Sequence, residues 1–407
     1  MSGMTAVAPT NAPMVDFDHH SDDFATNLET IVRDMRSCPV AYTDNNGGHF
    51  IVSTHALAKR VLSDVETFKS GREPDGSGGL FIPTFPIPIP GGALLPAECD
   101  PPYHTLLRRS LDKYFNKPAT EKLRPRIVEV VTGVFDRVVE MGEFDIVHDV
   151  GHLVGPTMMM GYIGFPLEFR TTFIDAIRTG FQRKVDDDDV SFLTEMAMQA
   201  MGVIMEKRKN PGDDVASKLM EALPDIDDVG MLSFLILLLF AGFETTEAMI
   251  TNSLWYLDEH RDLREELRND RSLIPGALDE FLRLAAPETT TVRTVTREVE
   301  LDGVRLHAGD RVLVLLASGN LDESVFPDPD RIDIRRNCGQ SLTFGHGIHH
   351  CPGNHMTKIE AEVILNQVLD RIPDYSIDRE NSKRFTDRAA ANGWITMPAR
   401  TNLAVNR

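Results

Sequence analysis

The feature that most constrains this chain is a long apolar segment near its middle. Residues 231–243 read MLSFLILLLFAGF, and the helical pattern around them extends from an acidic start at about Asp227 to His260. The apolar run is shorter than the roughly 20 residues of a membrane span, and it leads directly into Glu244. The segment therefore predicts a buried helix, which requires a fold that surrounds it.

Helical patterns occupy most of roughly the first two thirds of the chain, and strand signals are few. Residues 22–35 and 119–141 have the apolar spacing of helices. The segment HFIVS follows an NNGG turn and predicts a strand, and residues 291–317 alternate as strand, turn and strand. A helical pattern returns after Cys351. We therefore expect a mainly helical protein with a small amount of sheet.

A turn-rich segment interrupts the helices at residues 70–102. Its prolines and glycines exclude a helix or a central strand over more than 30 residues. Long irregular loops inside globular chains are more often functional than accidental. Its apolar side chains predict that it packs on the rest of the molecule: Leu80, Phe81, Ile82, Phe85, Ile87 and Ile89.

The charge and the cysteines narrow the class of protein. The chain carries 42 Lys and Arg residues against 62 Asp and Glu residues, a formal net charge of −20 at pH 7, which repels nucleic-acid phosphates and anionic lipids. Its four cysteines have no paired spacing, as in a reducing compartment, and the N-terminal residues lack the pattern of a signal peptide or membrane anchor. We expect a cytoplasmic protein with no nucleic-acid and no membrane partner, in which residues 1–21 form a loose N-terminal segment.

The most informative motif surrounds Cys351, in SLTFGHGIHHCPGNHMTKIEAEVIL at residues 341–365. A thiolate at the start of a helix is stabilised by free N–H groups and the helix dipole, and nearby glycines let amides approach the sulfur. The site therefore suits an anionic sulfur ligand. Local chemistry alone also allows a buried cysteine in a tight turn. A zinc site from His346, His349, His350 and Cys351 fits less well, because these residues crowd into one turn.

At this point the sequence resembles a known family. FGHGIHHCPG matches the haem-binding loop of the cytochrome P450 monooxygenases at every fixed position. The matching residues are Phe344, Gly347, His349, Cys351 and Gly353. The resemblance implies that the chain binds haem b, with Cys351 as the axial ligand of the iron.

Motifs far from the loop agree with the resemblance. EFLR supplies the family's Glu-x-x-Arg pair as Glu280 and Arg283, which share one face of a helix. FPDPDR supplies a third member, Arg331, followed by Ile332 where the family usually has Phe. The resemblance gives Glu280, Arg283 and Arg331 a structural role, which is to lock the chain around the haem pocket.

Four basic residues occupy the family's haem-propionate positions. DPPYHTLLRR contains His104 and Arg108, four residues apart on an expected helix, so that their side chains project together. Such a pair suits a carboxylate. By the same resemblance, Arg293 and His349 are further propionate partners.

The apolar helix contains AGFETT at residues 241–246. Ala241 and Gly242 lie four and three residues before Thr245, so small side chains share the face of its hydroxyl and leave a hollow. Ordinary helix packing through small residues explains the same pattern. The resemblance implies instead that Glu244 and Thr245 are the catalytic acid and alcohol that relay protons toward the oxygen site.

The resemblance also places the substrate pocket beside this helix. The lining residues that it implies are Leu237, Phe240, Ala241, Thr289, Thr290 and Val292. They are apolar with a few hydroxyls, which favours a neutral, lipophilic small molecule as substrate. Elsewhere, His148 and His152 have the spacing of a helical metal pair, but the residues between them lack the glutamate of a zincin motif.

Taken over residues 22–407, the resemblance implies one compact haem-thiolate domain with the cytochrome P450 fold, mainly α with a small β-rich lobe. The implied reaction inserts one atom of O2 into the substrate by hydroxylation or epoxidation. Electrons would come from a ferredoxin or flavodoxin-like protein with its reductase. A peroxide-driven peroxygenase and a non-enzymatic haem protein that binds gas are the alternatives; Glu244 and Thr245 argue against the first, and a catalytic acid on the helix argues against the second.

Overall fold

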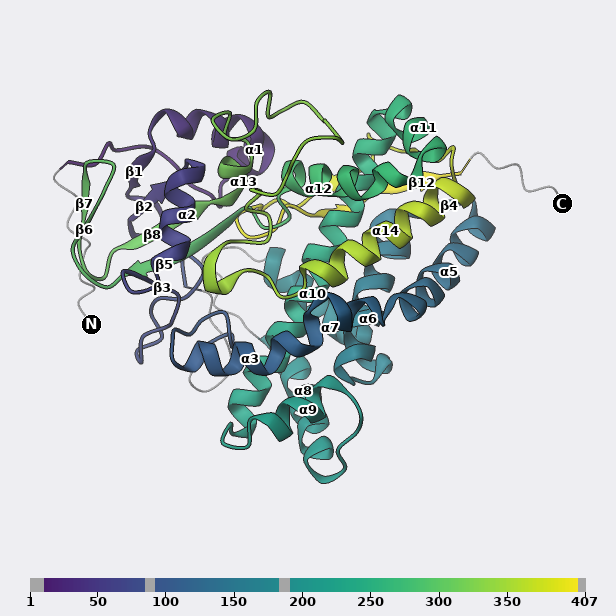
Figure 1. Cartoon of the computed structure of the whole chain (residues 1–407), viewed down its shortest axis with the longest axis horizontal. Coiled ribbons are helices and arrows are strands. Elements are labelled where there is room, and N and C mark those ends of the chain that lie inside the picture. Colours follow the sequence, from purple (N-terminus) through teal and green to yellow (C-terminus); the bar gives the residue numbers. More distant parts are fainter. Residues whose placement is uncertain (1–10, 85–91, 183–190, 402–407) are drawn as a thin grey trace.

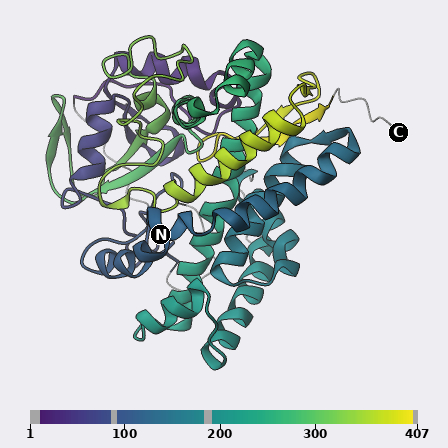
Figure 2. The same cartoon turned by 45° about the vertical axis from the view of Figure 1, so that its right-hand side comes forward.

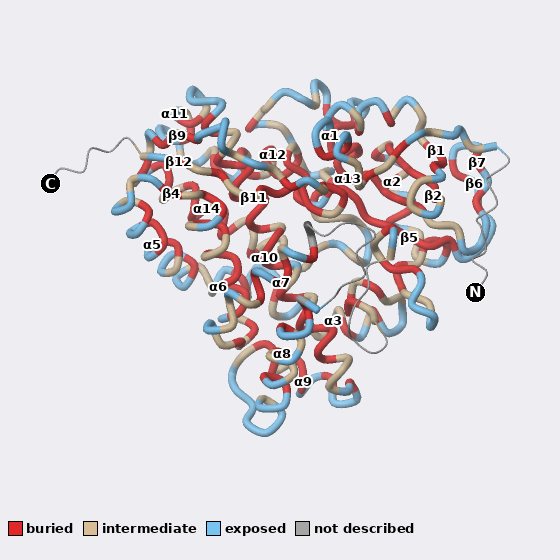
Figure 3. The backbone as a smooth tube through the Cα atoms, turned by 180° about the vertical axis from the view of Figure 1, so that it is seen from behind, coloured by how far each residue is buried: buried red, intermediate tan, exposed pale blue. Residues whose placement is uncertain are grey.

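Helix α10 (Asp228–Glu259) runs through the middle of the molecule. The computed structural model describes residues 11–84, 92–182 and 191–401. The Asp227 side chain caps α10 by accepting a hydrogen bond from the Gly230 N–H group, and the helix ends at His260. In the described part of the chain, α10 is the one helix long and apolar enough to cross a membrane, yet 67% of its most apolar window is buried inside the protein. The predicted buried helix is confirmed (Figure 3).

Helices α6, α7, α8, α12 and α14 contact α10 along its length. Helix α6 approaches closely because Gly155 faces the Gly242 carbonyl: a Cβ atom on Gly155 would lie 3.1 Å from that oxygen. The other helices are α1 (Asp22–Asp34), α2 (His55–Ser63), α3 (Tyr103–Phe115), α4 (Lys117–Glu121), α5 (Arg124–Met141), α6 (His152–Ile163), α7 (Arg170–Gln182), α8 (Ser191–Lys209), α9 (Val215–Ala222), α11 (Arg261–Asn269), α12 (Ile274–Ala285), α13 (Leu316–Asn320) and α14 (Asn354–Arg371).

A small β-rich lobe lies beside the helices (Figure 1). Its main sheet has the order β1-β2-β8-β5-β3, with β2 and β8 parallel and the other pairs antiparallel. These strands are β1 (Val40–Thr43), β2 (His49–Val52), β8 (Arg311–Leu315), β5 (Thr290–Val295) and β3 (Phe68–Lys69). Three smaller sheets contain β4 (Glu143–Asp145), β12 (Pro398–Arg400) and β9 (Ser376–Ile377); β6 (Val299–Leu301) and β7 (Val304–Leu306); and β10 (Lys383–Arg384) and β11 (Trp394–Thr396). The mainly α architecture with a small β lobe is as expected.

Two expectations about local structure need correction. The helix expected over residues 119–141 is divided into α4 and α5, because Pro125 at the start of α5 has no N–H group to donate to the Glu121 carbonyl at the end of α4. Residues 13–21 are packed rather than loose: the Val15 N–H group donates to the Tyr42 carbonyl at 2.9 Å, and Phe17 is buried. The ordered chain therefore begins before residue 22, and residues 1–10 lie outside the described part.

The described parts of the turn-rich segment, residues 70–84 and 92–102, pack on the molecule as predicted, because Ile82 and Leu95 are buried in its core. Arg72 and Glu98 form an ion pair at 2.7 Å inside it, and both side chains are buried. The Glu98 carboxylate also accepts the N–H groups of Leu80 and Leu94. Residues 85–91, which include the predicted Phe85, Ile87 and Ile89, lie outside the described residues.

Helix α12 lies against the chain that leads into the cysteine loop. A Cβ atom added to Gly276, near the start of α12, would lie 2.4 Å from the backbone carbonyl oxygen of Ile334. Backbone atoms cannot move aside as the end of a flexible side chain can. Any Cβ at position 276 would therefore clash with this oxygen, so the contact requires glycine. The close approach fixes how residues 331–341 lie beside α12.

This contact generates the first prediction. Gly276→Ala should lower the free energy of unfolding by about 1–3 kcal/mol, the usual range for overpacking. Gly133→Ala is the matched control, because Gly133 is exposed in α5 and an added Cβ meets nothing within 4 Å. Alanine there should raise stability by up to about 1 kcal/mol. Urea unfolding of both variants measures the difference, and equal stability would contradict the assigned contact.

Candidate active site

One cavity of about 260 Å³ lies between α10, α3, strand β5 and the loop before α14. In Figure 2 the yellow-green chain that leads into α14 passes between the β lobe and the helices. The lining is mostly apolar and includes Leu237, Phe240 and Ala241, three of the predicted substrate-side residues. Cys351 and Phe344 line the same cavity from the loop. The two motifs singled out in the sequence therefore face each other across one space.

The loop presents Cys351 at the start of α14. The Cys351 N–H group donates to the Phe344 carbonyl at 2.8 Å, which closes the loop. Gly347 has a φ of +74°, and an added Cβ would lie 2.5 Å from the Leu62 carbonyl oxygen, so glycine is required there. Gly353 is the N-cap residue of α14. The matched glycines thus shape the turn that aims the sulfur at the cavity.

Opposing effects act on the Cys351 thiol. Burial raises the pKa of Cys351, whereas the backbone N–H groups of Gly353 and Asn354 act to lower it. Metal ligation displaces such a proton, because the ligand is the thiolate. The alternative zinc site is not found: among the described residues, no three His, Cys, Asp or Glu side chains are placed to hold a metal ion. All four cysteines are free thiols.

The four predicted propionate partners gather at one edge of the cavity. The rings of His104 and His349 lie 4.2 Å apart, and the Nε2 atom of each is buried without a hydrogen-bond partner among the described residues. Arg108 donates to the His350 carbonyl at 2.6 Å and to Asp112. Arg293 is buried and donates to the Val292 carbonyl. Several donors thus converge here with few acceptors.

The electrostatics of this edge favour an anionic guest. Burial lowers the pKa of Arg293 to about 10, and it lowers the pKa of His349 well below its usual value, with Arg293 contributing. Both shifts express the cost of burying positive charge, which Glu288 and Asp100 offset only in part for Arg293. Propionate carboxylates at this edge would offset more of this cost. The buried Nε2 atoms of His104 and His349, which lack hydrogen-bond partners among the described residues, and the Cys351 thiol in the same cavity therefore fit a haem with its propionates.

On the opposite wall, the Thr245 Oγ1 atom donates to the Ala241 carbonyl at 2.7 Å, and both residues line the cavity. Gly242 agrees with both explanations of the AGFETT pattern. It lines the cavity, which fits a hollow beside Thr245, and an added Cβ would lie 2.4 Å from the Met159 Cε atom of α6, which fits close helix packing.

Glu244 does not line the cavity. It is buried in the helix packing, and its Oε1 atom has no partner among the described residues. Burial and then the neighbouring Glu247 raise the pKa of Glu244.

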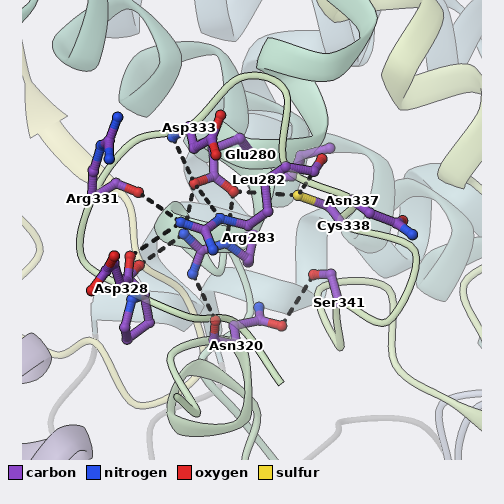
Figure 4. A network of polar contacts seen from close by, with 12 residues as sticks. Glu280, Leu282, Arg283, Asn320, Asp328, Arg331, Asp333, Asn337, Cys338 and Ser341 are labelled. Atoms are coloured by element: carbon purple, nitrogen blue, oxygen red, sulfur yellow. Dashed lines mark hydrogen bonds and ion pairs between the residues drawn. The ribbon is translucent and has the colours of Figure 1, made fainter. Parts of the chain in front are cut away.

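The Glu-x-x-Arg pair forms a fully buried ion pair at 2.7 Å (Figure 4). Arg283 also donates to the carbonyls of Asn320 and Pro329, each at 2.8 Å. Glu280 accepts the Asp333 N–H group at 3.0 Å. These bonds tie α12 to residues 320–333, which precede the cysteine loop. The structural role predicted for the pair agrees with this position.

The prediction for the third member, Arg331, is wrong. The Arg331 side chain is exposed and points away from Glu280, and only its backbone carbonyl joins the network (Figure 4). Arg336 takes the place instead, donating from Nε to Glu280 at 3.1 Å and to the carbonyls of Pro327 and Asp328. The turn at residues 328–331 directs Arg331 outward, and spacing from a motif could not reveal this.

Three of the predicted substrate-side residues also need correction. Thr289 and Thr290 are buried and donate to the backbone carbonyl of Ala389, and Val292 packs in the core of the β lobe. Because successive strand residues face opposite sides, Thr291 and Arg293 of β5 reach the cavity while Thr290 and Val292 do not. Given Arg293 as a cavity residue, strand alternation in the sequence was sufficient to predict Thr291.

Glu288 is a cavity residue that the sequence reasoning missed. It lies two residues before the start of β5 and lines the cavity. Burial raises the pKa of Glu288 to about 7, with Arg293 opposing the shift. A carboxyl group with this pKa is largely uncharged just below neutral pH. No motif marks this position.

Comparisons with known proteins agree with this geometry. The family model described as Cytochrome P450 matches residues 169–389. Cytochrome P450 monooxygenase PikC of Streptomyces venezuelae is 31% identical over 90% of this chain and 89% of its own length. The 6-deoxyerythronolide B hydroxylase of Saccharopolyspora erythraea is 32% identical over 88% of this chain and 92% of its own. A solved structure of a P450 EryK mutant with erythromycin B superposes with a TM-score of 0.84 at 28% identity, covering 95% of this chain and 99% of that one.

The Arg336 assignment generates the second prediction. Arg336→Ala should lower the free energy of unfolding by about 1–3 kcal/mol, because it leaves buried acceptors of a charged donor unsatisfied. Arg331→Ala should change it by less than about 0.5 kcal/mol, as for a surface residue. Denaturant unfolding of the haem-loaded protein measures both values. A larger loss for Arg331→Ala would restore the motif-based assignment.

Proposed function

The chain belongs to the cytochrome P450 family and is a haem b-binding monooxygenase, and from this premise we propose how its residues serve the reaction. One atom of O2 is inserted into a neutral, lipophilic small molecule by hydroxylation or epoxidation. The observation that carries the proposal is the single cavity that Cys351, the four basic residues and Thr245 share.

The haem is held from two sides in this proposal. Cys351 would hold the haem iron through its sulfur, which the turn formed by Phe344, Gly347 and Gly353 aims at the cavity. His104, Arg108, Arg293 and His349 would bind the propionates. The unpartnered Nε2 atoms of His104 and His349 support this role, since a buried donor without an acceptor is costly.

A haem held here would supply the oxygen-activating redox chemistry, and the Cys351 thiolate would tune it by donating electron density. The chain supplies protons and excludes water. Thr245 orients a proton donor at the cavity wall, since its hydroxyl lies there against the Ala241 carbonyl. Glu244 holds a proton in the adjoining helix packing, and its raised pKa supports this role near neutral pH.

The proposed substrate class follows from the lining of the cavity. Leu80, Phe81, Leu94, Leu237 and Phe240 line it. Two acids, Glu288 and Glu360, also line it, and burial raises the pKa of Glu288 to about 7 and that of Glu360 to about 8, which favours their uncharged forms. Relatives named Cyclomarin C epoxidase and 6-deoxyerythronolide B hydroxylase support both reaction types.

We further propose a cytoplasmic location and a separate ferredoxin or flavodoxin-like electron donor with its reductase. Arg109 and Lys113 are exposed on α3, whose Arg108 contacts the cysteine loop. They give the acidic molecule a local positive patch near the sulfur, which steers an acidic partner. Arg335 and Lys358 contribute less, because they pair with Glu266 and Asp279.

The experiment that tests the haem-thiolate assignment is the optical spectrum of the reduced, carbon monoxide-bound protein. The parent should show the long-wavelength Soret band of thiolate-ligated haem, and Cys351→Ala should lose it. Separate Cys38→Ala, Cys99→Ala and Cys338→Ala variants are the controls and should keep the band. If one of these controls lost the band while Cys351→Ala kept it, the ligand would be misassigned.

A fourth prediction concerns Thr245. Thr245→Ala should keep haem but form much less product for each reductant consumed, because the group that positions the proton donor is gone. General acid–base groups contribute on the order of 100- to 10,000-fold. Ser253→Ala is the matched control, because Ser253 makes the same bond to a carbonyl four residues back in α10. Parallel assays of product and reductant compare them; tight coupling in Thr245→Ala would show that the hydroxyl serves only helix packing.

A further inference from the structure

A second buried glutamate lies one turn beyond Glu244 on α10. Glu247 is 3% exposed, and it packs under Gly151, where an added Cβ would lie 2.5 Å from the Glu247 Cγ atom. Gly151 is the last residue of the short π-helix η3 (Ile146–Gly151). Residues three apart on a helix share a face, so Glu244 and Glu247 are neighbours. The proposed mechanism does not use Glu247.

Two histidines connect Glu247 to the surface. The His152 Nε2 atom lies 3.0 Å from Glu247 Oε2, and the His152 Nδ1 atom lies 3.4 Å from His148 Nδ1. His148 is exposed, whereas the side chain of His152 is 13% exposed and that of Glu247 is 3% exposed. The three side chains therefore form a row from solvent to the inside of the helix packing.

Arg178 of α7 completes the cluster. Its Nη1 atom lies 3.2 Å from both carboxylate oxygens of Glu247 and 2.8 Å from His152 Nε2. An imidazole nitrogen either donates or accepts. Nε2 therefore accepts from Arg178 in one state and donates to a Glu247 carboxylate in the other. The two states differ in the position of one proton.

The charges around the cluster favour a retained proton. Burial raises the pKa of Glu247 to about 8 against the pull of Arg178, and burial lowers the pKa of His152 to about 4. Arg178 offers one positive charge to two buried carboxyls, so Glu244 and Glu247 cannot both ionise cheaply. The pair therefore holds a proton near neutral pH.

The other groups that face the cluster do not replace this arrangement. From η3 and the strand before it, Asp145 accepts the N–H groups of Val147 and His148, and Asp149 accepts the Asp145 N–H group. Asp175 of α7 is exposed. Strand β11 offers the Trp394 and Ile395 carbonyls, which accept from Arg178. None of these contacts places a second acid between His152 and Glu247.

We propose that His148, His152 and Glu247 form a proton-uptake path from solvent to Glu244, an inference that rests on the proposed monooxygenase function. When Glu244 has released its proton, Glu247 passes one to it across one helical turn. Solvent water protonates His148 at Nε2, and His148 Nδ1–H gives its proton to His152 Nδ1. His152 Nε2–H then gives its proton to Glu247 Oε2. Each imidazole gains one proton and loses another, so no electrons move and no charge accumulates.

A purely structural ion pair is the competing explanation, because Arg178 also ties α7 to α10 and β11. It predicts that removing Glu247 costs stability only. Glu247→Gln keeps the shape and the acceptor for Arg178 but cannot take up a proton. Asp258→Asn is the matched control: Asp258 is a buried α10 carboxylate that pairs with Arg379 at 3.0 Å, about three turns farther along the helix.

The first readout is independent of turnover. Infrared difference spectra of the ferric, substrate-free protein at two pH values report protonated carboxyl groups. Glu247→Gln should lose part of the carboxylic-acid signal, and the remaining Glu244 signal should titrate at lower pH because its like-charged neighbour is gone. Asp258→Asn should retain both features of the parent. An unchanged spectrum in Glu247→Gln would contradict the inference that Glu244 and Glu247 share a proton.

The second readout is the solvent isotope effect on product formation. Glu247→Gln and His152→Gln should each slow turnover by up to about 100-fold, the low end for acid–base groups, and raise the isotope effect. The double variant should be no slower than either single variant, because either substitution alone already blocks the same path. His148→Gln changes an exposed residue and should give a smaller effect in the same direction.

The outcomes separate this inference from the proposed function. If the variants keep the thiolate band of the carbon monoxide complex and the parental isotope effect, the path is wrong while the monooxygenase assignment stands. The path would also be wrong if the losses of turnover in the two single variants added up in the double variant while the solvent isotope effect stayed unchanged. That result would indicate separate structural roles for Glu247 and His152. Absence of the thiolate band in the parent would instead remove the proposed function.

Discussion

A fully buried ion pair supports the arrangement of the whole site. The side chains of Glu280 and Arg283 are fully buried. The free-energy cost of removing two charges from water is offset only if every remaining donor and acceptor finds a partner. Here the partners are backbone groups of Asn320, Pro329 and Asp333 together with Arg336. Satisfying the pair therefore fixes the chain between β8 and the cysteine loop. The position of Cys351 is a consequence of this requirement.

Helix α10 imposes the complementary constraint on the other wall. Glycines at close contacts let η3 and α6 approach it, which buries Glu244 and Glu247 on one face while Ala241 and Thr245 remain at the cavity. The acids are thereby kept out of the apolar space but within one turn of it. The wall that α10 contributes to the cavity therefore carries no carboxyl group among the described residues.

Much of this architecture could be predicted from the sequence. The apolar run of α10 and the turn before β2 were sufficient to predict local elements, and the family resemblance that the cysteine motif carries was sufficient to predict the fold. The errors concern tertiary choices. Arg331 was assigned the role that Arg336 takes, because a motif gives spacing but not the direction of a turn. Glu288 and Glu247 carry no pattern at all. Their importance arises from burial, which only packing creates.

The central claim is that the sulfur of Cys351 and the basic edge of the cavity hold one haem between them. The most direct measurement is a crystal structure of the loaded protein with anomalous diffraction at the iron edge. The account predicts iron bonded to the Cys351 Sγ atom and haem carboxylates within hydrogen-bond distance of His104 Nε2 and His349 Nε2. Iron ligated by another residue, or propionates directed away from these two nitrogens, would contradict it.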